Sequence, residues 1–420
     1  MTPPFEKICV VGLGYVGLPT AAVIAGRGVP VLGVDINTVI VETINRGRIH
    51  IVEPGLEDLV NGAVTSGNLK AATAPEAADA FIIAVPTPFA DGNKPDLTHL
   101  KAAAKALAPV LKEGDLIVIE STSPVGTTRA FSQWLAGHRP DLTFPHDAGE
   151  ESRVRVAHSP ERVLPGHVLR ELAQNDRVVG GLSPRCAARA VEFYQIFVEG
   201  ECLITDAATA ELVKLAENAY RDVNIAFANE LSRVAGHLGV DVWDVVELAN
   251  RHPRVDILKP GPGVGGHCIA VDPWFIVDSA PEVTDLIRAA RRVNDAKPAY
   301  VANLVLNAAR GRDRPAVACL GLAYKADTDD LRESPAVEIV KLLADGLEGD
   351  ILVVEPHVDA LPASLEGLAG VRMTDLEEAI SKAQIVVLLA DHQAFLSMDT
   401  SMLEGKAVID TRGAWRSRAL

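Results

Sequence analysis

The chain has 420 residues, of which 48% are apolar and 5% aromatic, and its formal net charge is −16. This length exceeds what one ordinary hydrophobic core supports, so we expect about two or three domains. The acidic charge argues against general binding to nucleic acid or to an anionic membrane. An anionic ligand would therefore need a local cluster of Lys and Arg.

Cysteine usage and the apolar patterning narrow the class of protein further. The five cysteines are widely spaced and include no CxxC pair, so we expect neither a disulfide framework nor a bound metal. No secretory leader precedes the first apolar strand, and no stretch is long and apolar enough to span a bilayer. These features predict a cytoplasmic protein without membrane insertion.

Short apolar strands alternate with helical stretches in the first half of the chain, which is the pattern of a parallel sheet covered by helices. The expected strands are residues 7–12, 30–35, 80–86, 116–120, 155–158 and 177–180. Residues 207–238 contain no proline and carry apolar side chains at helical spacing, which predicts one helix of roughly 45 Å. A second helix is expected at about residues 284–310.

Strand–helix alternation restarts near residue 314. The run AVACLGLAYK at residues 316–325 resembles KICVVGLGYV at residues 7–16, and further strands are expected at 351–355, 385–390 and 407–410. We therefore predict an α/β protein with two Rossmann-like doubly wound parallel-sheet domains, residues 1–200 and 313–420, joined by a central helical segment, 201–312. The long central helix is a candidate dimer surface, or it packs only within its own chain.

A glycine-rich motif follows the first expected strand and precedes a helical stretch, which is the context that a dinucleotide fingerprint requires. Its residues are Gly12, Gly14, Tyr15, Val16 and Gly17. Asp35 ends the next strand, where a carboxylate accepts hydrogen bonds from ribose hydroxyls and repels a 2′-phosphate. The motif therefore predicts NAD rather than NADP, and a merely structural turn is the less favoured reading.

Two further strand ends carry hydroxyl side chains at the edge of the sheet where ligands of open α/β sheets bind. Thr87 lies in the run VPTP and Thr122 in the run STSPVGT. Both are candidate cofactor contacts, although hydroxyls at strand ends are also common as helix caps.

Four residues in the middle of the chain form a candidate reactive group. Lys214 and Asn218 lie four apart on one face of the long helix and could stabilise an oxyanion, or simply form a solvated face. Cys268 ends the run GPGVGGHC and is either a presented nucleophile or a small buried hydrophobe. Glu161, in SPERVLPG, is either a general base or a surface carboxylate.

Basic residues gather at strand ends of the expected second sheet. Lys325 and Arg332 enter the loop after residue 320, where Ala323 replaces the middle glycine of the fingerprint, and Arg412 follows the last strand. Each could be an exposed salt bridge, but three at strand ends favour a site for an anion that is not the pyrophosphate of NAD.

Together these motifs resemble the nucleotide-sugar 6-dehydrogenases, the UDP-glucose/GDP-mannose dehydrogenase family, over nearly the whole chain. The run GVGGHCIAVDP is the most specific match. SPERVLPG and His267 before the cysteine most resemble the branch that oxidises UDP-N-acetyl-D-mannosamine, since UDP-glucose dehydrogenases usually carry Ser before the cysteine.

The resemblance implies a four-electron oxidation of a sugar C6 alcohol to a carboxylate, with two NAD and one water. Cys268 would hold the aldehyde as a thiohemiacetal and then as a thioester, Lys214 would stabilise the oxyanion, and Asn218 with Asp272 would position water or alcohol. Glu161 would assist hydrolysis. The substrate contacts implied are Glu161, Arg162, Val163, Lys214, Asn218, Gly265, His267, Tyr324, Lys325 and Arg412, with Arg251 or Arg254 reaching the partner's site in a homodimer.

Three alternatives stay open. In the first alternative, the protein is a member of the same family whose substrate is UDP-N-acetylglucosamine or UDP-glucose rather than UDP-N-acetyl-D-mannosamine. A two-electron 3-hydroxyacid dehydrogenase also joins a dinucleotide fold to a helix with Lys and Asn one turn apart, but it needs neither Cys268 nor a basic second sheet. A non-catalytic nucleotide-sugar or NAD sensor would not need the reactive residues.

Overall fold

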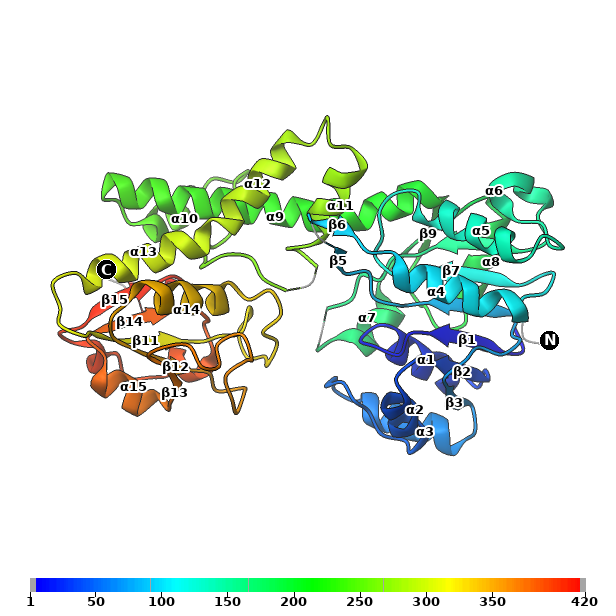
Figure 1. Ribbon diagram of the computed structural model, residues 1–420. Coiled ribbons are helices and arrows are strands. Elements are labelled where there is room, and N and C mark those ends of the chain that lie inside the picture. The colour runs from blue at the N-terminus through cyan, green and yellow to red at the C-terminus, as the bar shows by residue number, and fades with distance from the viewer. Residues whose placement is uncertain (1–4, 91, 165, 267, 416–420) are drawn as a thin grey trace. The chain divides into compact units, whose positions relative to one another are not determined.

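The computed structural model describes residues 5–90, 92–164, 166–266 and 268–415 (Figure 1). The chain divides into two compact units. The first comprises Met1–Glu217 and Trp274–Pro281, and the second comprises Asn218–Pro273 and Glu282–Leu420. The boundary falls inside the long helix α9 (Ala207–Leu238). No helix among the described residues is both long and apolar enough to cross a membrane.

The first unit is built on an eight-stranded sheet of order β10-β9-β8-β7-β4-β1-β2-β3, parallel except for the β8–β9 pair. The central strands are entirely buried and apolar, as a sheet covered on both faces requires. The strands are β1 (Ile8–Val11), β2 (Val31–Val34), β3 (Leu69–Ala72), β4 (Ala80–Ile83), β7 (Leu116–Ile119), β8 (Arg155–His158), β9 (Arg177–Gly181) and β10 (Cys202–Asp206).

Helices cover both faces of this sheet. One face packs on α1 (Gly17–Gly26), α2 (Thr38–Asn45), α3 (Leu56–Thr65) and α8 (Pro184–Tyr194), and the other packs on α4 (Thr98–Leu107) and α5 (Thr127–His138). Smaller elements are the ribbon β5 (Phe89–Ala90) with β6 (Lys94–Pro95), and the helices α6 (Pro145–Ala148), α7 (Val168–Gln174) and α11 (Asp272–Ser279).

The second unit contains a five-stranded parallel sheet of order β13-β12-β11-β14-β15. Its strands are β11 (Ala316–Leu320), β12 (Asp350–Val354), β13 (Val371–Met373), β14 (Ile385–Leu388) and β15 (Ala407–Asp410). Helices α13 (Lys297–Ala309) and α14 (Pro335–Gly346) cover one face, and α15 (Leu376–Lys382) covers the other. The remaining helices are α10 (Val242–Ala249), α12 (Asp285–Asp295) and α16 (Gln393–Leu396).

Two predicted helices have different outcomes. The helix expected at residues 207–238 is confirmed as α9. The single helix expected at about 284–310 is wrong, because α12 ends at Asp295 and α13 begins at Lys297, with Ala296 between them. Pro298 explains the break, since it has no N–H to donate back into the preceding turn and its ring obstructs a continuous helix.

Candidate functional site

The fingerprint turn between β1 and α1 has the shape that a dinucleotide needs. Gly12 adopts φ +92°, and a Cβ there would lie 2.5 Å from the carbonyl oxygen of Ala84. A Cβ on Gly17 would overlap the carbonyl oxygen of Gly12. A Cβ on Gly14, in contrast, would meet no atom within 4 Å, so the space beside Gly14 is open. That opening, at the N-terminal end of α1, fits a pyrophosphate.

Asp35 follows β2 and lies against the same turn. Its Oδ2 accepts a hydrogen bond from the backbone N–H of Leu13 at 3.1 Å, and its Oδ1 accepts one from Asn37 at 2.9 Å. The carboxylate is thereby oriented yet only partly buried, so it suits ribose hydroxyls. Tyr15, 40% exposed, and the half-buried Val16 complete the turn.

The two expected hydroxyl contacts meet where β4 and β7 end. Thr87 donates its hydroxyl to the carbonyl oxygen of Thr122 at 2.5 Å, and Ser121 donates to the carbonyl of Val85 at 2.7 Å. Both loops therefore form one surface beside the fingerprint turn, at the switch in strand order between β1 and β4.

Glu211 is a positioning residue that the sequence motifs did not single out. It is buried in α9 and accepts hydrogen bonds from the backbone N–H groups of Gly126 and Thr128 and from the hydroxyl of Thr128, each at 2.6 Å. A carboxylate at the N-terminus of α5 also matches the helix dipole. It ties the loop that carries Thr122 to the helix that carries Lys214.

Glu161 lies in the interior of the first unit, so its interpretation as a surface carboxylate is wrong. Its Oε2 lies 2.8 Å from Nη1 of the buried Arg177, and its Oε1 accepts the backbone N–H of Arg162 at 2.6 Å. The guanidinium of Arg162 in turn pairs with Glu217 on α9 at 2.7 Å, while Val163 is half-buried. The loop after β8 is thus fixed to the helix one turn after Lys214.

The reactive residues of the second unit converge in one place. Asn218 donates from Nδ2 to Oδ2 of the buried Asp272 at 2.5 Å. The backbone N–H of Asp272 donates to the carbonyl oxygen of Cys268 at 2.8 Å, so the cysteine and the aspartate lie one turn apart. A purely solvated face is therefore the wrong reading for Asn218. Lys214, which belongs to the first unit, is half-buried and makes no ion pair with the described residues.

Cys268 differs in its surroundings from Cys9 and Cys319. Burial raises the pKa of the Cys9 and Cys319 thiols to about 12, which leaves them inert. Cys268 is half-buried at the end of the glycine run.

The glycines of this run are needed for close packing on the loop between β11 and α14. A Cβ on Gly265 would lie 2.6 Å from the Cβ of Tyr324 and 2.7 Å from the carbonyl oxygen of Glu333. Gly266 adopts φ +82° and donates its N–H to the carbonyl of Arg332 at 3.1 Å. The Cys268 loop therefore rests directly on the loop that carries Lys325.

The predicted basic residues differ in their partners. Lys325 is exposed, whereas the guanidinium of Arg332 pairs with Asp330 at 2.6 Å. Arg412 pairs with Asp391 at 2.7 Å, and its Nη1 lies 2.9 Å from where a Cβ of Gly261 would be. Arg412 thus reaches the start of the glycine run.

Three further residues belong to the predicted substrate site. Arg251 and Arg254 are both exposed after α10. His267 lies outside the described residues.

Comparison with known proteins agrees with this geometry. Three models of the UDP-glucose/GDP-mannose dehydrogenase family match: its NAD binding domain at residues 6–198, its central domain at 208–296 and its UDP binding domain at 318–417. The chain belongs to the UDP-glucose/GDP-mannose dehydrogenase family. It is an NAD-dependent nucleotide-sugar dehydrogenase with two Rossmann-like sheets and a long central helix, as the sequence predicted.

Full-length relatives are similar throughout. An NDP-N-acetyl-D-galactosaminuronic acid dehydrogenase from Ralstonia nicotianae is 61% identical, covering 99% of this chain and 98% of that protein. A UDP-N-acetyl-D-mannosamine dehydrogenase from Yersinia pestis is 55% identical, covering 98% and 100%. The solved structure of a UDP-D-ManNAc dehydrogenase from Pyrococcus horikoshii has a TM-score of 0.87 at 38% identity, covering 98% and 96%.

Proposed function

We propose that this protein oxidises the C6 alcohol of a UDP-linked 2-acetamido sugar to the carboxylate, with UDP-N-acetyl-D-mannosamine as the expected substrate. The observation that carries the chemistry is that Asn218 of α9 bonds Asp272, which lies one turn after Cys268, at the end of a glycine run that packs on the Lys325 loop. The 55% identity to a UDP-N-acetyl-D-mannosamine dehydrogenase supports the choice of sugar.

The reaction assigns a role to each reactive residue. The thiolate of Cys268 adds to the C6 aldehyde and forms a C–S bond, which retains the intermediate between the two oxidations. The turn at Gly12–Gly17 and Asp35 would hold NAD, which would supply the hydride acceptor for each of the two oxidations, one molecule after the other. Lys214 stabilises the oxyanion, and water then breaks the C–S bond of the thioester, which releases the carboxylate and the thiolate.

Hydrolysis needs a carboxylate that can accept a proton from the reacting water and a polar group that orients this water. Asn218 and Asp272 are hydrogen-bonded to each other next to Cys268, so they are suited to orient that water. The carboxylate of Glu161 faces Arg177, which favours a positioning role over the base that the family resemblance implies.

We further propose that the protein is a homodimer formed through α9. The helix exposes an apolar stripe at seven- and four-residue spacing, with Tyr220 at 73%, Phe227 at 58%, Val234 at 46% and Leu238 at 67% exposure. This spacing keeps the four side chains on one face of the helix, and such a face is suited to a second copy. A cytoplasmic location is also part of the proposal, because a catalytic thiol must stay reduced.

The test is an NADH assay on a panel of UDP-sugars with the N-acetyl-mannosamine, N-acetylglucosamine, N-acetylgalactosamine and glucose groups. We expect two NADH per sugar and kcat/KM for the mannosamine at least about tenfold above the others. Cys268→Ser, the matched control, should bind both ligands yet form no acid at a useful rate. One NADH per sugar with released aldehyde, or near-normal acid from the variant, would refute the covalent route.

A second candidate substrate is the galactosamine configuration, because relatives named for N-acetyl-D-galactosaminuronic acid reach 61% and 62% identity. The two sugars differ at C2 and C4. A preference for UDP-N-acetylgalactosamine in the same panel would select this candidate without changing the chemistry at C6.

A further inference from the structure

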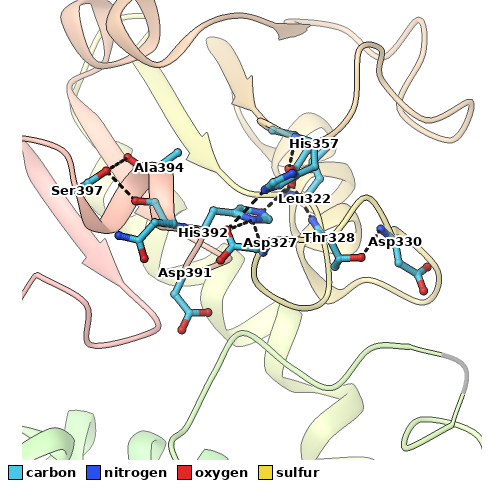
Figure 2. Close-up of polar contacts among 12 residues, drawn as sticks. Leu322, Asp327, Thr328, Asp330, His357, Asp391, His392, Ala394 and Ser397 are labelled. Atoms are coloured by element: carbon cyan, nitrogen blue, oxygen red, sulfur yellow. Dashed lines mark hydrogen bonds and ion pairs between the residues drawn. The ribbon is translucent and has the colours of Figure 1, made fainter. Parts of the chain in front are cut away.

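His392 is fully buried just after β14, and both of its ring nitrogens have partners (Figure 2). Its Nδ1 accepts the backbone N–H of Asp327 at 2.9 Å, and its Nε2 lies 3.1 Å from Oε2 of Glu355. Because Nδ1 acts as an acceptor, the proton sits on Nε2 and is donated to the carboxylate. His392 therefore bridges two segments of the second unit.

Glu355 is the counterpart, in the second unit, of the ribose carboxylate Asp35. Each residue follows the strand that pairs with the first strand of its sheet, β12 or β2. Each accepts the backbone N–H of the residue after a turn glycine: Leu322 to Glu355 at 2.7 Å, and Leu13 to Asp35 at 3.1 Å. The second unit thus repeats the turn of the NAD site.

The two carboxylates differ in whether their oxygens can still accept hydrogen bonds from a ligand. Asp35 is partly exposed, whereas Glu355 is only 4% exposed. The oxygens of Glu355 also accept hydrogen bonds from Ala323 at 3.0 Å, from the backbone of His357 at 3.1 Å and from His392. Glu355 is therefore internally satisfied and does not act as a ribose ligand, which leaves recognition to the adjoining loop.

The first half of that loop, residues 322–327, is held at both ends by the same network. Glu355 fixes Leu322 and Ala323 at its start. His392 fixes the backbone of Asp327 at its far end, where Asp327 adopts the uncommon φ of +55° and accepts the N–H of Gln393 at Oδ1, 2.9 Å away. Tyr324 and Lys325 lie between the two anchors.

We propose that His392 is a positioning residue of the UDP site, which presents Lys325 to the diphosphate by fixing Asp327 to Glu355. The inference rests on the proposed function, in which this loop binds UDP. Tyr324, between the two anchors, packs against Gly265 and Gly266 at the base of the Cys268 loop.

A metal site is the competing interpretation of the cluster. Ligand atoms of Asp327, His357 and His392 all lie within 4.8 Å of one another, and Oδ1 of Asp327 lies 3.6 Å from Nε2 of His357. However, the single lone pair of Nδ1 in His392 already accepts the Asp327 N–H, so a metal would have to break that bond. The hydrogen-bonded arrangement favours positioning.

The experiment measures UDP and NAD binding to the full-length protein by calorimetry. His392→Gln keeps a donor for Glu355 but loses the acceptor for Asp327, and His392→Asn does the reverse, while His392→Leu loses both. We expect each amide variant to weaken UDP binding by about tenfold and the leucine variant to weaken it further, with NAD affinity unchanged. The KM for the UDP-sugar should rise in parallel, with kcat within about threefold.

His357→Ala separates the two interpretations, since it removes a metal ligand but no hydrogen bond to the His392 ring. Under our proposal it keeps UDP affinity within about twofold, and EDTA has no effect. Three outcomes would overturn the proposal. UDP affinity could fall with His357→Ala or with EDTA, or the His392 variants could lose NAD affinity together with UDP affinity. The third outcome is unchanged UDP affinity in the His392 variants. If the wild type binds no UDP, the proposed function itself fails.

Discussion

Glu120 is a buried carboxyl just after β7, and one guanidinium has to serve both it and Glu161. Burial, and to a lesser extent the charge of Glu161, raise the pKa of Glu120 to about 7, against the opposing effects of Arg177 and of the Tyr194 hydroxyl, which donates to Oε1 at 2.7 Å. Glu120 is therefore partly protonated near neutral pH.

This pKa predicts how stability changes with pH. Because the folded carboxyl holds its proton to about pH 7 and the unfolded one only to about 4.5, folding binds a proton between these values. Stability should fall as pH rises through this window, by on the order of 3 kcal/mol for a shift of this size. Glu120→Gln should flatten the profile, which denaturant titrations from pH 5 to 8 would measure. Parallel profiles for the two proteins would contradict the assignment.

The burial of individual site residues was the least predictable feature. The sequence shows Glu161 between prolines and gives no signal for Glu211, because the partners that define their roles lie far along the chain. Glu211 bonds Thr128, 83 residues away, and the Arg177 that pairs with Glu161 belongs to another strand. Spacing on one helix does reveal a shared face, which is why Lys214 and Asn218 were found.

At the scale of elements, strands that are buried on both faces were predicted well. β1, β4, β7 and β11 are continuous apolar runs. The strands missed in the two large sheets, β3, β10 and β13, lie at sheet edges and are alternating, largely exposed or only half-buried. The turn after β11 was predicted as an anion site from its Lys and Arg. The buried histidine that holds this turn follows a different strand and left no local signal.

The glycine run gives a prediction at this scale. Gly265→Ala should destabilise the second unit by about 1–3 kcal/mol, because its Cβ would collide with Tyr324 and with the backbone of Glu333. The shift of the loop should lower acid formation by at least about tenfold while NAD binding stays normal. Steady-state kinetics with calorimetric NAD binding would check both.

Gly137→Ala is the matched control, since a Cβ at that position in α5 meets no atom within 4 Å. It should be neutral or slightly stabilising, because alanine is the better helix former. Equal losses of activity in both variants would show that the packing on Tyr324 is not the cause.

For the whole molecule, the apolar stripe on α9 predicts the oligomeric state. Phe227→Asp should convert a dimer to a monomer in sedimentation or light-scattering measurements, because a buried, unpaired carboxylate is costly at such an interface. If Arg251 or Arg254 acts in the partner's site, the monomeric Phe227→Asp variant should also lose activity.

Val52→Asp, in the first unit and 83% exposed in the wild type, is the control for an added surface charge and should leave the mass unchanged. A Phe227→Asp variant that remains dimeric would exclude this face as the interface.

The division into three domains that the sequence predicts stays a prediction. The structure divides into two compact units, and the boundary between them lies inside α9.

The return of the chain to the first unit at Trp274–Pro281 has a consequence for biosynthesis. The N-terminal sheet is finished when β10 emerges from the ribosome, but its unit still lacks most of α11 until some seventy further residues have been made. A fragment cut at residue 200 would also lack Glu211 and the edge strand β10. Neither unit is therefore a separable gene segment, and the catalytic loop is translated before the first unit is complete.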